Sequence, residues 1–376
     1  MGLKNISATV ALWVTFMCFL GISSGEQILD KRFGKLFPFF SIVRITNQPC
    51  VPESGSQMGT CFTNTQCEKA AGTVNGKCAS GFGVCCVVSA TCESTITQNN
   101  TVFRNRDAPN SFTPTGLELC NVRISKPNSK ICQVKLDFIS MNLAPADAMG
   151  QCMSDRLSIN GATPNVPANL CGMLTGQSMY LDFGSSDRLS MSMITDGAAN
   201  PSARDWNVKV TYYECNAQLR APDGCLQYFT AATGQVRMLG YPMAPHLADL
   251  DYTVCVRPED GAGSIVWSHC QGEPAGDVFS MTKAKRMDDT MGMPEDMCNM
   301  DYVMIMTDEV MSTAVPMPKM NDRYCGNALK AMPPFTVRST AKPFIMRVKT
   351  DSTEPAEDVM NTGFCLAWRQ EPPRPK

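Results

Sequence analysis

Histidine is scarce in this sequence: the 376 residues contain two, His246 and His269. Neither lies in a His-Glu-x-x-His metal motif, and no Gly-x-Ser-x-Gly nucleophile motif is present. We interpret both histidines as isolated surface or loop residues. Because acid–base, nucleophilic and metal-assisted catalysis need such groups, we predict that the protein is not an enzyme.

Excess charge and long hydrophobic runs are also lacking. The formal net charge is −2 and there is no basic patch, which argues against nucleic acid as a partner. The one long apolar run, residues 8–22, follows Lys4 and is too short to span a bilayer. We therefore predict a signal peptide at residues 1–25 rather than a retained anchor, and a secreted, extracellular protein with no membrane attachment after cleavage.

Polar segments border the predicted folded region. Residues 26–49 are predicted to be a flexible lead-in, and residues 369–376 a polar tail. The dibasic pair Lys31-Arg32 is either a propeptide cleavage site or a solvated charge pair, and the sequence leaves both alternatives open.

Cysteine, in contrast, is abundant. Of 19 cysteines, Cys18 lies in the predicted signal peptide, which leaves an even set of 18. In an oxidising compartment such a set is expected to pair completely, and Cys-x2-Cys zinc spacing is missing. Along the chain the cysteines fall into three groups of six: Cys50, Cys61, Cys67, Cys78, Cys85 and Cys86; Cys92, Cys120, Cys132, Cys152, Cys171 and Cys215; Cys225, Cys255, Cys270, Cys298, Cys325 and Cys365.

The second and third groups indicate an internal duplication. Their spacings are similar, and "CMSD" (152–155) and "LSMSMITD" (189–196) correspond to "CNMD" (298–301) and "FIMRVKTD" (344–351). Apolar residues alternate with polar ones in these stretches, and Pro and Gly clusters separate them. The pattern predicts an all-β protein with two antiparallel β-sandwich domains.

These motifs, with "LCG" (170–172), "RYCG" (323–326) and "GFCLAW" (363–368), resemble the CUB domain, an extracellular jelly-roll-like sandwich. The resemblance covers residues 92–215 and 225–368. It implies the pairs Cys92–Cys120, Cys152–Cys171, Cys225–Cys255 and Cys298–Cys325. The two further cysteines of each copy remain to pair as Cys132–Cys215 and Cys270–Cys365; the sequence does not fix this pairing, because the extra cysteine is not in register between the copies.

Residues 50–86 form a separate module that is too small to build a core without covalent bridges. Six cysteines allow 15 connectivities. The module, which ends in Cys85-Cys86, is similar to the clip domains of secreted arthropod proteins. This similarity implies the pairs Cys50–Cys85, Cys61–Cys78 and Cys67–Cys86. The whole order resembles secreted arthropod proteins that contain CUB domains.

The CUB resemblance also implies a Ca²⁺ site, built from a glutamate before the third cysteine, the aspartate of Cys-x-x-Asp and the aspartate that ends the later strand. Asp155 and Asp196 match in the first copy, and Asp301 and Asp351 in the second. The glutamate has no clear match: Asp147 or Ala144 takes its place in the first copy, and Glu295 or Asp296 in the second. The alternative is that these aspartates cap turns.

Two other features carry weaker hypotheses. Residues 281–320 contain eleven methionines, a composition that is compatible with copper binding but more typical of an adaptable core or contact surface. Asn99 lies in an Asn-x-Thr glycosylation sequon.

The sequence as a whole predicts a secreted adaptor that binds an extracellular protein or glycan, with a role in innate defence as one hypothesis. Alternatives are a structural component of matrix or cuticle and a regulator of a clip-type protease cascade. The sequence does not determine the oligomeric state.

Overall fold

The fold is described from a computed structural model, which defines residues 45, 47–54, 58–163, 166–243, 245–272, 278–282, 298–307, 322–329, 335–354 and 360–373. The predicted signal peptide, Lys31-Arg32, Glu295, Asp296 and most of the methionine-rich segment lie outside these residues. No helix in the described part of the chain has the length and hydropathy of a membrane-spanning segment.

The six-cysteine module is a small four-stranded sheet with one helix, α2 (Asn64–Lys69), which begins with a capping box between Thr63 and Gln66. Neighbouring residues of a strand point to opposite faces, so the adjacent Cys85 and Cys86 of β4 reach different partners. A 3₁₀ turn, η1 (Ala79–Gly81), precedes β4. The strands pair in the order β1 (Pro49–Cys50), β2 (Gly59–Phe62), β4 (Gly83–Val87), β3 (Thr73–Cys78).

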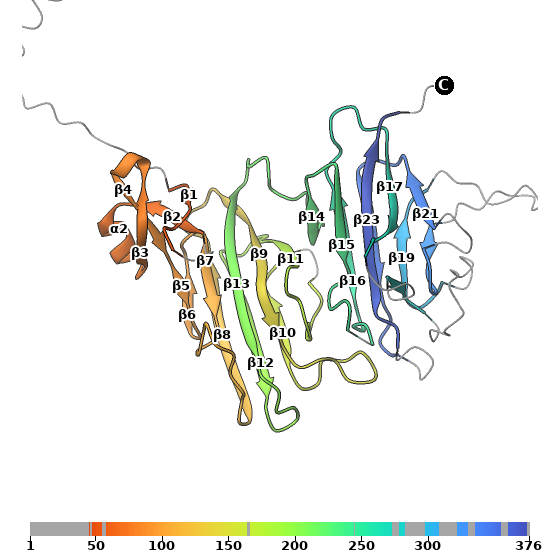
Figure 1. The fold of residues 1–376 in the computed structure, drawn as a ribbon, viewed down its shortest axis with the longest axis horizontal. Helices are drawn as coiled ribbons and strands as arrows, with labels where there is room; N and C mark the ends of the chain where they lie inside the picture. Colours follow the sequence, from red (N-terminus) through yellow and green to blue (C-terminus); the bar gives the residue numbers. More distant parts are fainter. Residues whose placement is uncertain are drawn as a thin grey trace, which may run out of the picture. The chain divides into compact units, whose positions relative to one another are not determined.

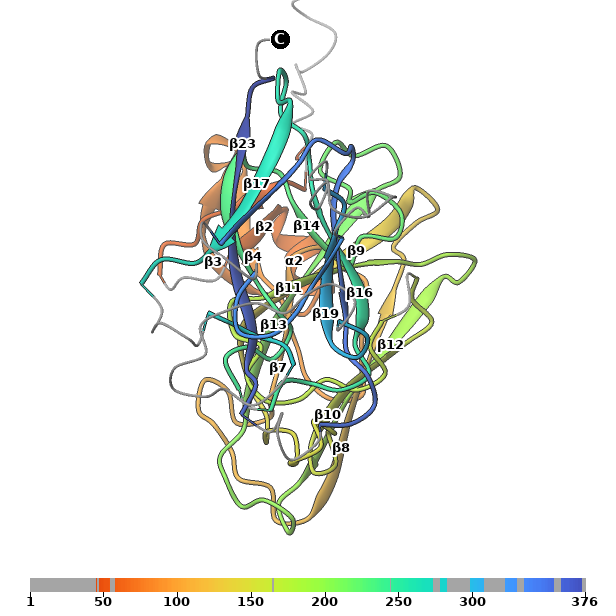
Figure 2. The same cartoon turned by 90° about the vertical axis from the view of Figure 1, so that its right-hand side faces the viewer.

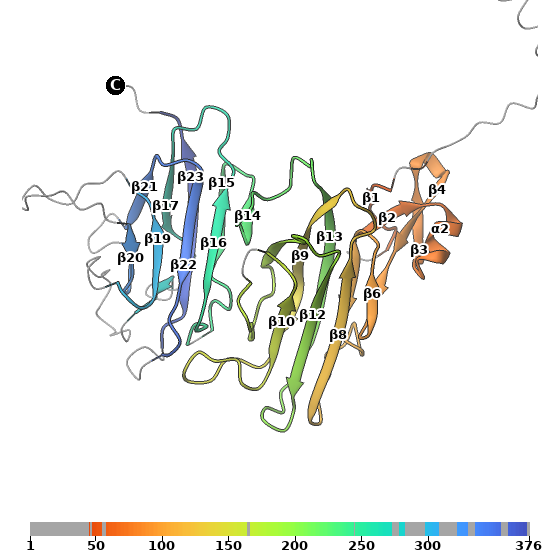
Figure 3. The same cartoon turned by 180° about the vertical axis from the view of Figure 1, so that it is seen from behind.

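The first sandwich consists of two sheets with nearly strict alternation of buried and accessible residues, for example along β12 and β13. One sheet faces the viewer in Figure 1 and the other in Figure 3. The sheet in Figure 1 has the order β11 (Ser178–Asp182), β9 (Ile131–Asn142), β13 (Asp205–Glu214), β7 (Thr101–Arg104), β5 (Ser89–Ala90). The second sheet has the order β10 (Arg156–Asn160), β12 (Arg188–Asp196), β8 (Leu117–Ser125), β6 (Ser94–Ile96).

The second sandwich repeats this plan, and Figure 2 shows its two layers side by side, with β17 and β23 in one and β16 and β19 in the other. The first layer has the order β15 (Thr233–Arg237), β23 (Gly363–Glu371), β17 (Ser264–His269), β21 (Thr336–Ser339), and β18 (Phe279–Ser280) also pairs with β23. The second has the order β14 (Gln227–Phe229), β16 (Asp251–Val256), β22 (Phe344–Lys349), β19 (Tyr302–Ile305), β20 (Arg323–Tyr324).

The predicted all-β class with antiparallel sandwiches is confirmed, although three short edge pairs, β5·β7, β6·β8 and β14·β16, are parallel. Strand β23 continues to Glu371, three residues beyond the predicted domain boundary at residue 368.

The described chain contains nine disulfides. Seven of them join cysteines that the two resemblances pair, and the other two join the cysteines that remained. In each sandwich the longest of them, Cys132–Cys215 or Cys270–Cys365, ties a central strand region to the last strand. Such bridges restrict the unfolded chain and so stabilise the fold. The other seven are Cys50–Cys85, Cys61–Cys78, Cys67–Cys86, Cys92–Cys120, Cys152–Cys171, Cys225–Cys255 and Cys298–Cys325.

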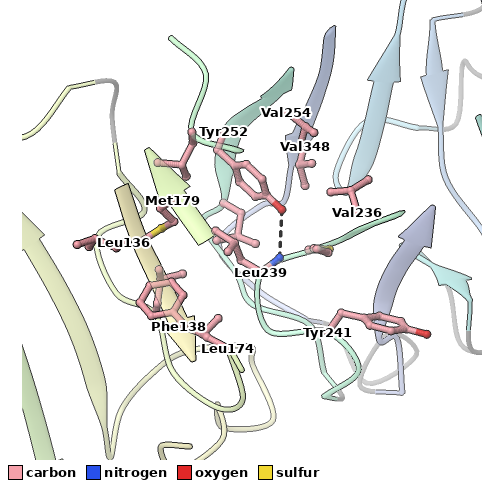
Figure 4. Close-up of a cluster of buried hydrophobic side chains, with 14 of the residues drawn as sticks. Leu136, Phe138, Leu174, Met179, Val236, Leu239, Tyr241, Tyr252, Val254 and Val348 are labelled. Carbon is pink, nitrogen blue, oxygen red and sulfur yellow. Dashed lines mark hydrogen bonds between the residues drawn. The ribbon is translucent and has the colours of Figure 1, made fainter. Parts of the chain in front are cut away.

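One buried cluster of hydrophobic side chains runs through both sandwiches. Figure 4 shows Phe138 and Met179 of the first sandwich and Leu239 and Tyr252 of the second within it. The Tyr252 hydroxyl accepts a hydrogen bond from the Leu239 N–H at 3.1 Å, which satisfies a buried polar group.

The edges of the two sandwiches also meet through the backbone. The N–H of Tyr180, on edge strand β11, donates to the carbonyl of Leu226 at 2.8 Å, directly before edge strand β14. The Tyr180 ring packs edge-on against Tyr228, with centroids 5.8 Å apart. The short connection between the sandwiches is thus supported by direct contacts between their edge strands.

Candidate functional site: the strand-end aspartates of the two sandwiches

In the first sandwich, Asp155 forms a buried ion pair with Arg204. Both side chains are completely inaccessible to solvent. The guanidinium binds both carboxylate oxygens, through Nε to Oδ2 and through Nη2 to Oδ1 at 3.2 Å. The carboxylate also accepts the N–H groups of Ala144 and Asp196, at 2.8 and 3.0 Å. Four donors therefore saturate Asp155, and its charge is balanced by a residue of the same chain.

Arg204 is itself held by backbone groups of the loop before β13. It donates to the carbonyls of Ser202 and Asn200, the latter at 2.8 Å. These contacts aim the guanidinium at Asp155, because the five donors of arginine lie in a fixed plane.

The side chains of the other two aspartates predicted to bind Ca²⁺ in this sandwich form hydrogen bonds within their own loops. Asp147 Oδ1 accepts the N–H groups of Met149 and Gln151, and Asp196 Oδ1 accepts that of Ala198. These are turn contacts of the kind that aspartate commonly makes. The structure does not bring Asp147, Asp155 and Asp196 into one site, and a guanidinium lies against the only one of them that is buried. The residues present therefore do not fit Ca²⁺ here.

Asp301 lies at the corresponding place in the second sandwich, three residues after Cys298. Its Oδ1 accepts the N–H of Asp351 at 2.8 Å, as Asp155 accepts that of Asp196. The side chain of Asp351 turns back to its own loop and accepts the N–H of Thr353. Asp301 and Asp351 are thus neighbours, but the Asp351 carboxylate forms its hydrogen bond within a turn of its own loop.

Two residues that the sequence analysis did not associate with this site lie beside Asp301. His246, Asp301 and Glu354 are 2%, 1% and 0% exposed. Each offers one ligand atom, and these atoms all lie within 4.8 Å of one another. His246 Nδ1 is 3.0 Å from Glu354 Oε1, and Nε2 is 3.0 Å from the carbonyl oxygen of Met281. Burial lowers the pKa of His246 below its usual value.

The interpretation of the histidines as surface residues is wrong for His246, which is buried in this cluster. His269 is half-buried: its Nε2 accepts the N–H of Leu329 at 3.0 Å, and its ring stacks with Phe279 and Phe335. Burial lowers its pKa as well. Both histidines therefore make structural contacts.

A loop of the first sandwich contacts the loops that carry His246 and Glu354. The Gln151 side-chain amide donates to the Asp249 carboxylate at 3.1 Å and to the Ser352 carbonyl at 2.8 Å. In addition, the Ala248 N–H donates to the Gly150 carbonyl. The cluster in the second sandwich thus lies next to a contact between the two repeats.

A separate groove of about 470 Å³ lies between the six-cysteine module and the first sandwich. Asn75 of the module and Ile139 and Trp206 of the sandwich line it. Trp206 Nε1 and Asn207 Oδ1 are buried and have no hydrogen-bond partner among the described residues. The polar residues Asn75, Ser140 and Asp205 also line the groove and can offer hydrogen-bond donors and acceptors to a ligand.

Asn99, the predicted glycosylation residue, is half-buried. Its Oδ1 accepts the N–H groups of Asn100 and Tyr212, at 3.0 and 2.9 Å. These bonds fix the side chain at the start of β7, and glycosylation there stays a prediction.

Comparison with known proteins identifies the second repeat. Residues 222–371 match the family described as the animal CUB domain. No curated protein matches the chain.

Among solved structures, the chain is similar to the CUB1-EGF-CUB2 domains of rat MASP-1, at 15% identity over 74% of this chain and 100% of that one, with a TM-score of 0.26. The MASP-1 CUB2 domain bound to Ca²⁺ is 17% identical over 32% of this chain and 98% of that one, with a TM-score of 0.25. The extracellular region of zebrafish Gpr126/Adgrg6 is 12% identical over 74% of this chain and 36% of that one, with a TM-score of 0.27. The family match shows that the chain contains a CUB domain, at residues 222–371.

Proposed function

We propose that this protein is an extracellular, non-enzymatic adaptor that binds another protein. The observation that carries this proposal is the match of residues 222–371 to the CUB domain, a module that generally binds proteins. The nine disulfides support an oxidising, extracellular location. The two histidines, which would be the first choice for acid–base chemistry, are both engaged in packing and hydrogen bonds.

The first sandwich is proposed to be a second CUB-like domain, outside the residues that match the family. Support comes from the shared plan of two sheets and from the equivalent contacts of Asp155 and Asp301 with the N–H of a strand-end aspartate. The module at residues 50–86 is proposed to be clip-like, on the basis of its cysteine spacing.

The groove between the module and the first sandwich is our candidate binding surface. We propose that it takes a polar peptide segment of an extracellular partner, because a peptide bond supplies both a donor and an acceptor for the polar residues Asn75, Ser140 and Asp205 that line the groove. Ile139, 46% exposed at the groove, would add apolar contact. A glycan is the second candidate, since hydroxyl groups also supply donors and acceptors.

The test is affinity capture from body fluid with the full mature chain and two matched variants. Ile139→Ser changes the groove, whereas Ile345→Ser changes a strand residue of similar exposure, 41%, on the second sandwich. We expect a partner that is retained by wild type and Ile345→Ser and is lost, by about tenfold or more, with Ile139→Ser. Equal retention by both variants would remove the groove from the proposal.

Two additional measurements test whether binding depends on Ca²⁺ and whether the protein has a structural role instead. Capture in the presence of a calcium-specific chelator tests whether recognition depends on Ca²⁺; the groove as described needs no ion. Multimers of the chain itself, with no captured partner, would favour a structural role in matrix or cuticle.

A further inference from the structure

The loop between β3 and β4 of the six-cysteine module presents one large apolar side chain to solvent (Figure 1). Phe82 is 66% exposed, and a glycine stands on each side of it. At Gly81 an added Cβ would meet no atom within 4 Å, so the loop is open to solvent at that point. A single exposed hydrophobic residue is ordinary on a protein surface, but a phenyl ring between two glycines can also enter a narrow recess.

The backbone of this loop is held in one conformation. Ala79 and Ser80 have φ angles of 49° and 55°, in the left-handed region that residues with a side chain rarely adopt. Such a conformation persists only where the surrounding structure imposes it. The disulfides of Cys78 and Cys85 tie the two ends of the loop to neighbouring strands. Phe82 is therefore presented without the entropy cost of ordering a mobile loop.

A pocket of about 120 Å³ lies between the two sheets of the first sandwich. Its walls include the buried side chains of Phe112, Met193 and Trp206, together with the Cys92–Cys120 disulfide. The Phe112 and Trp206 rings meet edge to face, with their centroids 5.3 Å apart. Apolar cavities of about 150 Å³ bind benzene, so this pocket has the size and the walls to take one phenyl ring.

Charged residues line the exposed side of the pocket. Arg106 and Glu118 form an ion pair there, with 2.7 Å between Nη1 and Oε2. Asp107 places a second carboxylate 3.7 Å from the same guanidinium. These three residues together carry one excess negative charge. Lys77, which is exposed in the strand that leads to the Phe82 loop, supplies a complementary positive charge.

We propose that Phe82 of one chain binds in this pocket of a second copy of the protein, against the rings of Phe112 and Trp206. The second copy is the occupant that fits, because the loop and the pocket match in size, apolar character and charge. Aromatic walls and the sulfur of Met193 favour an aromatic ring in the pocket. Leu119, which is 59% exposed and lines the pocket, adds apolar area to the contact.

The two surfaces that meet in this contact are different. A bound pair of chains therefore still has one unoccupied pocket and one unbound Phe82 loop, and further chains can add head to tail. The groove between the module and the first sandwich takes no part, apart from Trp206, which lines both the groove and the pocket. Self-association and the binding of another protein are thus separate properties of the chain.

The test is sedimentation velocity of the full mature chain over a range of concentrations. Phe82→Ser removes the ring, and Val51→Ser is its control, at a residue of the same module that is 73% exposed. Leu119→Arg places a charge at the pocket, and Leu219→Arg is its control, at a residue that is 53% exposed. We expect the wild type and both controls to associate as concentration rises, and Phe82→Ser and Leu119→Arg each to weaken association by about tenfold or more.

A mixture of the two variants gives the sharper result. Phe82→Ser keeps the pocket and Leu119→Arg keeps the loop, so the mixture should form a one-to-one dimer and nothing larger, although neither variant associates alone. Toluene, a probe of phenyl size, should reduce the association of the wild type. Ile139→Ser should leave association unchanged, because Ile139 lines the groove and not the pocket.

Wild-type protein that sediments as a monomer up to about 1 mM would overturn the proposal. Association that continues unchanged in Phe82→Ser would overturn it as well, because the ring would then not be the contact. The third contrary result is a mixture of Phe82→Ser and Leu119→Arg that stays monomeric while the wild type associates, with both variants shown by circular dichroism to be folded.

Discussion

The two sandwiches have a buried aspartate at the same position, but different residues contact it in each. Asp155 and Asp301 each follow a cysteine by three residues, are buried, and accept the N–H of the aspartate that follows a long strand, at 3.0 and 2.8 Å. In the first sandwich the remaining partner is the Arg204 guanidinium. In the second it is a cluster with His246 and Glu354.

The difference shows that two copies of one fold can surround an equivalent buried aspartate with different charged or polar side chains. A guanidinium is permanently charged, so the first site is complete once the chain has folded. The second site instead brings the imidazole of His246 and the carboxylate of Glu354 to the aspartate.

The strongest test of this comparison is Arg204→Met in the first sandwich. It leaves the buried Asp155 without its cation, and the expected cost is about 3–5 kcal/mol in the free energy of unfolding. Urea denaturation followed by circular dichroism measures it. The control is Arg347→Met, which removes an exposed ion pair with Asp251 and should cost less than about 1 kcal/mol. Equal effects in the two variants would contradict the assignment of Arg204.

The long disulfides allow the two sandwiches to be compared directly. Replacing Cys132 and Cys215 by alanine should cost about 2–5 kcal/mol, and so should replacing Cys270 and Cys365. The sequence separations, 83 and 95 residues, are similar, so the two losses should agree within about 1 kcal/mol. Denaturation midpoints of the two double variants measure this. A much larger loss in one sandwich would show that the bridge there also maintains native packing.

The pH dependence of stability should come from the second sandwich, since the first, residues 92–215, contains no histidine. Burial holds the pKa of His269 below its usual value. Between the folded and the unfolded pKa the unfolded chain binds a proton that the folded chain does not, so stability falls as pH falls below about 6.5. Denaturation of the protein at pH 7.5 and 5.5 should show this loss, and His269→Gln should reduce it. An unchanged slope in the variant would exclude His269 as a source.

The smallest expected effect concerns Asp147, the carboxylate that the sequence put forward as a Ca²⁺ ligand. Asp147→Ala removes two hydrogen bonds within an exposed loop and should cost about 1 kcal/mol. Calorimetric titration with Ca²⁺ should give the same result for variant and wild type. A Ca²⁺-dependent stabilisation that disappears with Asp147→Ala would restore the calcium hypothesis for the first sandwich.

The sequence allowed the sandwiches to be predicted because their signals are local. Alternating apolar residues define strands such as β12, and the repeated cysteine pattern separates the two copies. The partners of the aspartates could not be predicted in this way. Arg204 is 49 residues from Asp155, in a loop with no motif, and only the folded chain brings them together. His246 is likewise remote from Asp301, and a lone histidine more often lies at the surface. Glu354, three residues after Asp351, was the nearest available clue.

The backbone contact between β11 and the residue before β14 has a consequence for self-association. An open strand edge can template a strand from another molecule and so seed filaments. Here the Tyr180 N–H is already bonded to Leu226, and Tyr228 packs over it, so these two edges shield each other. Polymerisation by strand addition is therefore blocked at the junction, and any fibrous assembly of this protein must begin at another surface.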